Sequence, residues 1–133
     1  MSDASLEERK SNKGNAVVAD DFSTYSYVFN MDNPLFAIKE VRQALSMVID
    51  RNAIIDEITF GKAATGFLPD VVLDTATNKT FRQNALISKE AKLNEALALL
   101  ENVDFKGINT AFKLTVNDDE ESVAIAELVK AAW

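Results

Sequence analysis

The stretch from Asn30 to Pro69 constrains the fold more than any other part of the sequence, because its breakers set where its helices begin and end. Pro34 interrupts the chain after a segment that alternates like a strand. Asp50 stands between two helical patterns and is a good N-cap, since its carboxylate can accept hydrogen bonds from the free amides of a first helical turn. Gly61 ends the second pattern. The stretch predicts a strand followed by two short helices that meet at an angle.

Apolar residues recur after Pro34 at the spacing of amphipathic helices. They are Ile38, Val41, Ala44, Leu45 and Val48 in the first helix and Ile54, Ile55 and Ile58 in the second. Arg42 falls beside the first stripe, and Asp50 is near enough in sequence to be its partner. Arg42 could hold a carboxylate or a carbonyl of a ligand. We favour a structural arginine whose stem packs while its head pairs locally.

Two segments alternate as half-buried strands do. In residues 23–30, Tyr25, Tyr27 and Phe29 share one side, and Thr24, Ser26 and Val28 share the other. Residues 111–116 place Phe112, Leu114 and Val116 opposite Lys113 and Thr115. Shorter strands are predicted at 16–19 and 71–73. The aromatic side of 23–30 is expected to face the core rather than stack on a ligand.

The second half of the chain predicts a loop and two further helices. Residues 61–79 lack a sustained period and are expected to form a long loop. Ser88 is the expected cap of a helix ending near Glu101, and the acidic turn at 117–119 is expected to cap a last helix that reaches Trp133. The resulting order of strands and helices predicts an α/β or mixed α+β fold. The side chains expected to share its core are those of Val41, Leu45, Ile54, Ile58, Leu97 and Leu114.

Composition excludes several classes of function. The 133 residues are 47% hydrophobic, enough for one domain with its own core, and the net charge of -7 disfavours nucleic acid and anionic membrane surfaces as partners. The absence of cysteine and histidine removes disulfides, thiol chemistry, the usual zinc ligands and the commonest general base. The acidic pairs at 20–21, 118–119 and 120–121 are interpreted as turn and helix caps rather than as metal or acid/base sites. We expect no cofactor, no metal and no catalysis. The beginning of the chain lacks the pattern of an export signal.

The stretch from Asn30 to Pro69, named the organising stretch from this point on, resembles a known family when its residues are taken together. Asn30, Pro34 and Phe36 are followed by Val-Arg-Gln-Ala-Leu-Ser at 41–46, by an apolar residue before Asp50-Arg51, and by Gly-Phe-Leu-Pro at 66–69. This combination is similar to the solute-binding proteins of bacterial peptide and nickel ABC transporters, the dipeptide- and oligopeptide-binding family. The resemblance covers about residues 22–133.

The resemblance implies a role and a place for this chain. Proteins of this family have two lobes that close over a ligand, so residues 22–133 would be part of the second lobe, preceded by a polar arm and lead-in strand at 1–21. The function implied is capture of peptides outside the cytoplasmic membrane and delivery to an ABC permease, with nickel or another small solute as an alternative cargo. Ser26 and Val28 would face the cleft, unless they pack under a neighbouring strand. Because the last predicted helix reaches the end of the sequence, we expect a fragment whose exposed apolar surface promotes self-association.

A rival interpretation comes from another class. The chain could be an independently folded domain whose helices dock a protein partner, without binding a small molecule. A small enzyme ranks third, since only carboxylate, lysine or hydroxyl chemistry would be available to it.

Overall fold

The structure, a computed structural model, describes residues 6–15, 17, 19, 21–82 and 84–133. Its helical elements, in chain order, are α1 (Leu6–Ser11), η1 (Lys13–Asn15), α2 (Pro34–Ala37), α3 (Lys39–Met47), α4 (Arg51–Glu57), α5 (Leu93–Leu100) and α6 (Glu120–Ala132). Within the described residues, β pairing is limited to one antiparallel bridge between Leu73 and Thr80. The regular structure of the described residues is therefore almost entirely helical, and the predicted mixed α/β class is wrong for its strand content.

Asp50 caps a helix as the sequence predicts, and Pro34 begins a further short helix that was not predicted. Asp50 caps α4 by accepting hydrogen bonds from the amides of Asn52 and Ala53, at 2.9 and 3.1 Å. Pro34 does more than interrupt the chain, because it occupies the first turn of the short helix α2, which Asn33 caps through the Leu35 amide at 3.0 Å. The two predicted helices are confirmed, and α2 precedes them.

The caps of the last two helices were predicted with different success. Asp119 caps α6, accepting from the Ser122 amide at 2.8 Å and from its hydroxyl at 2.7 Å. Ser88 does not cap α5, which begins only at Leu93. Residues 89–92 are instead hydrogen-bonded to the junction of α3 and α4. The Lys89 carbonyl accepts from the Arg51 amide at 2.8 Å, and the Lys92 amide donates to the Met47 carbonyl at 2.7 Å.

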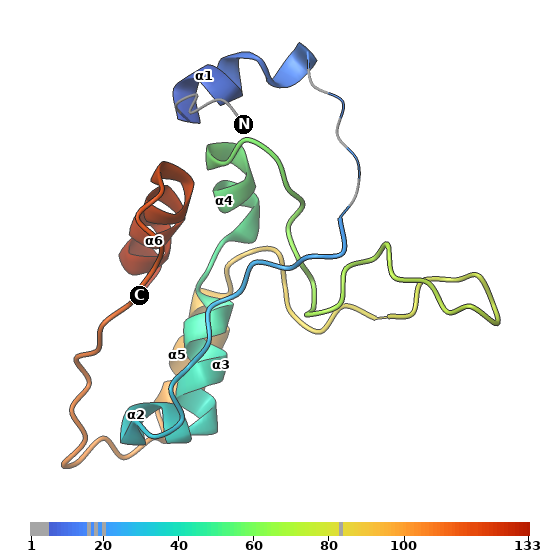
Figure 1. The fold of residues 1–133 in the computed structure, drawn as a ribbon. Helices are drawn as coiled ribbons and strands as arrows, with labels where there is room; N and C mark the ends of the chain where they lie inside the picture. The colour runs from blue at the N-terminus through green and yellow to red at the C-terminus, as the bar shows by residue number, and fades with distance from the viewer. Residues whose placement is uncertain (1–5, 16, 18, 20, 83) are drawn as a thin grey trace.

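Helices α3 and α5 lie side by side and form the centre of the molecule, as Figure 1 shows. Helix α4 continues away from the end of α3, and α6 packs beside α4. The extended segment before α2 passes along α3, while the one before α6 runs back along the other side of the molecule (Figure 1). After α4 the chain first runs back beside this helix, and the loop drawn in yellow-green then projects away from the helices (Figure 1).

The core differs in membership from the predicted one and centres on α2 and the start of α3. Leu35, Phe36 and Val41 are buried, and the half-buried apolar side chains packed against them are Phe29, Ile38, Leu45, Leu100, Val103, Phe105, Ile108 and Phe112. Val41 and Leu45 thus belong to it as predicted.

Leu97 was wrongly assigned to the core, since 53% of it is exposed. Helix α5 buries Ala96 instead, and α3 buries Ala44, so the two helices meet through small side chains. Ile54, Ile58 and Leu114 are half-buried but lie outside the cluster around Phe36.

The predicted strands at 23–30 and 111–116 are wrong as sheet strands, although covered and exposed side chains alternate as predicted in 26–30 and 111–116; at Thr24 and Tyr25 the predicted sides are wrong. Both segments are extended, and in 111–116 exposed and half-buried residues alternate at every position. Neither pairs with another described segment, so no sheet forms. The strand predicted at 71–73 is reduced to the bridge at Leu73. The strand predicted at 16–19 involves residues 16 and 18, which lie outside the described residues.

Candidate functional site

The extended segment of residues 22–30 carries the side chains that the sequence singled out for ligand contact. Ser26 is exposed, and 89% of Val28 is exposed. The described residues therefore leave Val28 uncovered, and its place in a ligand cleft stays a prediction. Thr24, on the same side, is half-buried, because its hydroxyl donates to the Phe67 carbonyl at 2.8 Å. The segment thus presents a hydroxyl and a branched apolar side chain to its surroundings.

The opposite side of this segment is fixed by aromatic packing. The Phe29 ring lies 5.0 Å from that of Phe36, which lies 5.0 Å from that of Phe112. Trp133 joins the same group, with its ring centroid 5.4 Å from Phe112 and 6.5 Å from Tyr27. The prediction that Tyr27 and Phe29 face the core is confirmed. Tyr25 contacts Tyr27 edge to face at 5.5 Å but stays largely exposed.

The Tyr27 hydroxyl is buried and has no hydrogen-bond partner among the described residues. Burial raises the pKa of Tyr27, and the neighbouring Tyr25 hydroxyl raises it further. Tyr27 therefore stays neutral at physiological pH and cannot act as a base. An unpaired buried hydroxyl costs free energy, so this group is a weak point of the aromatic packing.

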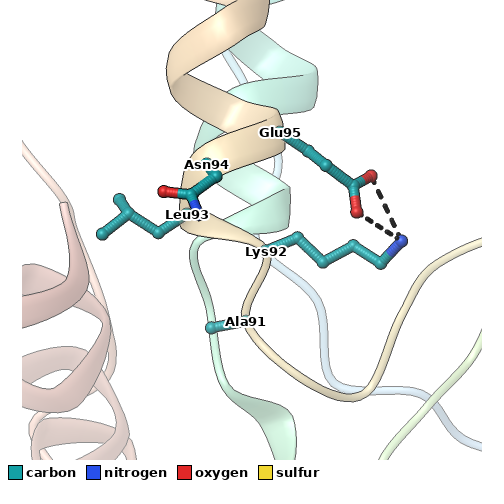
Figure 2. Close-up of a pocket in the computed structure, with 5 residues that line it drawn as sticks. All are labelled: Ala91, Lys92, Leu93, Asn94 and Glu95. Atoms are coloured by element: carbon teal, nitrogen blue, oxygen red, sulfur yellow. Dashed lines mark hydrogen bonds and ion pairs between the residues drawn. The ribbon is translucent and has the colours of Figure 1, made fainter.

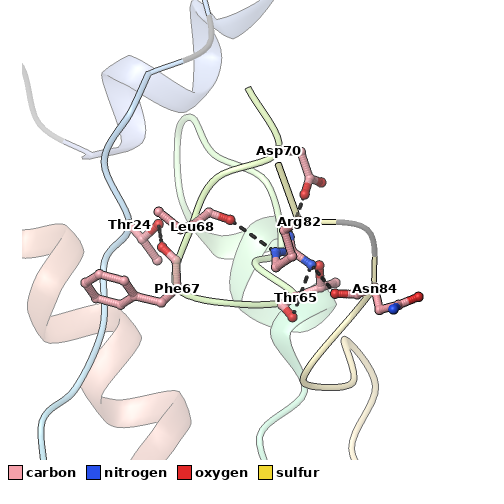
Figure 3. Close-up of polar contacts among 7 residues, drawn as sticks. All are labelled: Thr24, Thr65, Phe67, Leu68, Asp70, Arg82 and Asn84. Atoms are coloured by element: carbon pink, nitrogen blue, oxygen red, sulfur yellow. Dashed lines mark hydrogen bonds and ion pairs between the residues drawn. The ribbon is translucent and has the colours of Figure 1, made fainter. Parts of the chain in front are cut away.

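Arg82 organises the loop that touches this segment (Figure 3). Its guanidinium donates to the carbonyls of Leu68 and Asn84, at 3.2 and 3.0 Å, and forms an ion pair with Asp70. Only 12% of the Arg82 side chain is exposed. A β-carbon added at the buried Gly66 would lie 2.9 Å from Arg82 Cδ and Nε, so a larger residue at this position would force the Arg82 side chain to shift.

The loop in turn supports the candidate face. The Thr65 carbonyl accepts from the amides of Leu86 and Ile87, at 2.8 and 3.2 Å, which closes the loop at its base. The hydrogen bond from Thr24 to Phe67 then joins the loop to the segment of residues 22–30, as Figure 3 shows. The loop therefore helps to fix the position of Thr24, two residues before Ser26.

Arg42 has a structural role in this chain. Its guanidinium donates to the carbonyls of Phe36 and Ala37, at 2.6 and 3.1 Å, and so caps the carboxyl end of α2. Asp50 caps α4 and is not its partner. The local pairing favoured from the sequence is confirmed, and Arg42 has carbonyl partners within its own chain.

Sequence reasoning missed the role of Arg51. Its guanidinium donates to the carbonyls of Ser46, Ile49 and Ser88, at 3.1, 3.2 and 3.1 Å, and to the Ser46 hydroxyl at 3.0 Å. Burial lowers the pKa of Arg51, but an arginine remains charged at any physiological pH. Arg51 thus joins the end of α3 to the segment before α5. Its position directly after a helix cap, between the apolar pairs at 48–49 and 54–55, was the signal that could have revealed it.

The described surface has a shallow pocket at the start of α5, lined by Ala91, Lys92, Leu93, Asn94 and Glu95. Figure 2 shows Leu93 on one side and Lys92 turned toward Glu95 on the other. Lys92 Nζ lies 3.0 Å from a carboxylate oxygen of Glu95, three residues later, so the two charges neutralise each other. A second hollow is lined by Ile38, Glu40, Leu99, Asn102, Val103 and Asp104. Neither gathers the convergent polar groups of a small-molecule site.

The acidic pairs behave as caps where the structure describes them. The Ser122 amide and hydroxyl lower the pKa of Asp119. The Ser23 hydroxyl and the Phe22 amide do the same for Asp21. In the described part of the chain, no group of three or more acidic residues could hold a metal ion. No helix described here is long and apolar enough to cross a membrane.

Comparison with known proteins gives one result. The model of a family described as bacterial extracellular solute-binding proteins, family 5 Middle, matches residues 1–133. Neither the curated proteins nor the solved structures contain a match to this chain.

Proposed function

The chain belongs to the family 5 bacterial extracellular solute-binding proteins, and we propose that it is part of the second lobe of a protein that captures peptides for an ABC importer. Membership of the family implies a solute-binding role in transport and no catalysis. The observation that carries the proposal is the family match over residues 1–133. Peptides are the proposed cargo, and a permease of the cytoplasmic membrane is the proposed partner. The family is extracytoplasmic in general, and we assign the whole protein to the periplasm or the cell surface.

The arrangement of the chain supports a role as one wall of a cleft. Residues 1–21 would form an arm and residues 22–133 the partial lobe. Two arginines of the organising stretch, Arg42 and Arg51, donate hydrogen bonds to carbonyls of their own chain. Ligand contact would then fall to exposed groups such as Ser26 and Val28, which the aromatic packing beneath them holds in place.

The proposed contact face can be tested with two valines that share high exposure but differ in place. Val28→Arg in the whole protein should weaken peptide binding at least about 10-fold, because a long charged side chain would fill space meant for the ligand. Val17→Arg is the matched control, since Val17 is also fully exposed but lies in the arm. Calorimetric titration with a mixed di- to pentapeptide library measures both. Equal affinities of the two variants would remove Val28 from the ligand face.

A second function is favoured by the amount of exposed apolar surface. Large apolar side chains that are exposed include Phe22, Val28, Phe67, Phe81 and Leu86. A domain that docks a protein partner would also expose such residues. The two functions differ in the response to peptides, because a docking domain would not bind them in any context.

A further inference from the structure

Exposed aromatic rings gather where the loop touches the first extended segment. The Thr24 hydroxyl donates to the Phe67 carbonyl at 2.8 Å, which brings Phe67 against the segment of residues 22–30, as Figure 3 shows. More than half of each of three rings close to this contact is exposed, those of Phe22, Tyr25 and Phe67. We name these three side chains the aromatic patch. Phenylalanine is among the residues most often buried, so exposed rings at one contact indicate a binding surface.

The aromatic patch adjoins the candidate ligand face. Ser26 and Val28 are exposed and follow Tyr25 within three residues. Successive residues of an extended chain are only about 3.3 Å apart, so the Tyr25 ring lies within reach of a ligand bound at Ser26. The edge-to-face contact with Tyr27, at 5.5 Å between ring centroids, holds the Tyr25 ring without covering it.

The charge beside the aromatic patch is negative. The sequence contains neither lysine nor arginine between Lys13 and Lys39. Asp21 is exposed, and its oxygens accept from the Ser23 hydroxyl and the Phe22 amide at 2.7 and 2.6 Å. These hydrogen bonds lower the pKa of Asp21, so it is ionised at neutral pH. A carboxylate has about four acceptor positions, and about two of them remain available to a ligand.

The cation that organises the loop is already neutralised. The guanidinium of Arg82 pairs with Asp70 and donates to carbonyls of the loop, and only 12% of its side chain is exposed. The other cations of the loop are Lys62, at its beginning, and Lys79, in the turn closed by the single β bridge; neither adjoins Phe67 in the sequence. The aromatic patch thus combines aromatic rings with one ionised carboxylate.

We propose that the aromatic patch and Asp21 bind cationic side chains of the cargo, so that the protein captures peptides containing lysine or arginine in preference to acidic peptides. This inference rests on the proposed function, in which the cargo is a peptide. Aromatic faces attract ammonium and guanidinium groups, and the carboxylate of Asp21 adds an ion pair. The net charge of -7 acts in the same direction at longer range. An acidic peptide is repelled by the carboxylate and gains nothing from the rings.

Calorimetric titration of the whole protein with three matched peptides tests this preference. Ala-Lys-Lys-Ala, Ala-Gln-Gln-Ala and Ala-Glu-Glu-Ala have the same length and termini and differ in the charge of their central side chains. The cationic peptide should bind at least about 10-fold more tightly than the acidic one, because an exposed ion pair and a cation–π contact each change affinity by about 2- to 5-fold. The ratio should fall as the salt concentration rises from about 0.02 to 0.5 M, since salt screens exposed charges.

Two pairs of variants assign the preference to the aromatic patch and Asp21. Phe67→Ala should weaken binding of the cationic peptide about 2- to 5-fold more than binding of the neutral one. Phe81→Ala is its matched control, because Phe81 is equally an exposed ring of the loop but lies beyond the β bridge. Asp21→Asn should act in the same way as Phe67→Ala. Its control is Asp104→Asn, which removes the same charge from an exposed turn after α5 where the carboxylate also accepts from a backbone amide.

Each outcome decides the proposal. Equal affinity for the three peptides overturns the cationic preference and keeps the proposed function, whereas absence of binding by all three overturns both. A preference for the cationic peptide that Phe67→Ala and Asp21→Asn change no more than their controls would place its source elsewhere and overturn the role of the aromatic patch. All four substituted positions are exposed, so the variants are expected to fold.

Discussion

Replacing Arg51 with alanine should destabilise the chain more than replacing Arg9, which forms one partly exposed ion pair. The guanidinium of Arg51 makes four hydrogen bonds that join the last turn of α3, the link to α4 and the segment before α5. Alanine leaves the carbonyls of Ser46, Ile49 and Ser88 without this donor. Since α3 and α5 form the centre of the molecule, the loss acts on their relative position.

The magnitude follows from the number and setting of these bonds. A hydrogen bond to a charged group contributes about 1.5 to 3 kcal/mol when it is well buried. Arg51 is half-buried, so water can replace part of what is lost, and we expect a total loss of about 2 to 4 kcal/mol rather than the sum of four bonds. For a chain of this size, that corresponds to a Tm lower by on the order of 10 °C.

Urea unfolding followed by tryptophan fluorescence measures the effect. Trp133 is the single tryptophan and packs against Phe112, so its emission reports the aromatic cluster. Arg9→Ala is the matched control, because Arg9 forms one partly exposed ion pair with Glu121, at 3.4 Å, and should cost less than about 1 kcal/mol. If the two variants unfold at the same urea concentration, Arg51 does not join α3 to the segment before α5 in solution.

Three further predictions use the same unfolding assay. Leu35→Ala should cost about 2 to 5 kcal/mol because Leu35 is buried in the core, whereas Leu97→Ala should cost less than about 1 kcal/mol; equal losses would place the core elsewhere. Tyr27→Phe should leave stability unchanged or raise it by about 1 kcal/mol, since it removes a buried hydroxyl that has no hydrogen-bond partner among the described residues; a loss above about 1 kcal/mol would reveal a partner for it. The pKa of Asp119 is lowered in the folded chain. Its ionised carboxylate therefore stabilises α6 at pH values above 3.8, the ordinary pKa, and this contribution is lost as the pH falls through the pKa of the folded state. Asp119→Asn should therefore be less stable than the native chain at pH 7, with a difference that shrinks below pH 3.8; a difference independent of pH would contradict this.

Local signals predicted the helices well. Asp50 was recognised as a cap, and so was the turn at 117–119 that contains Asp119. Both carboxylates satisfy amides within the next three residues, which requires no knowledge of the tertiary fold. The same is true of the stripe containing Val41 and Ala44, which are both buried. Arg42 was expected to pair locally and does so, with carbonyls five and six residues earlier.

Tertiary contacts explain where the sequence misled. Ser88 has the chemistry of a cap, but the carbonyl of Ser88 is bound by Arg51, and Lys89 and Lys92 are held at the junction of α3 and α4. Leu97 has the hydrophobicity of a core residue, but α5 turns Ala96 toward the interior. No pattern in the sequence indicates which of these longer-range contacts forms.

The strands illustrate a different limit. Alternation in residues 23–30 and 111–116 correctly assigned the covered sides of Tyr27, Phe29 and Phe112. A pattern with a period of two shows which side of a segment is covered, but it does not supply the neighbouring strand that pairing requires. The candidate face at Ser26 and Val28 rests on that alternation, and its exposure agrees with it.

Titration of peptides into the whole protein and into the 133-residue chain tests the central claim most directly. A cleft between two lobes buries the ligand on both sides, so one wall alone offers too little contact to offset the entropy lost on association. With a mixed di- to pentapeptide library, calorimetry should show binding at micromolar or lower Kd for the whole protein and no measurable heat for the chain alone. Micromolar binding by the chain alone would contradict the two-lobe account, and absence of binding by the whole protein would contradict its role in peptide capture.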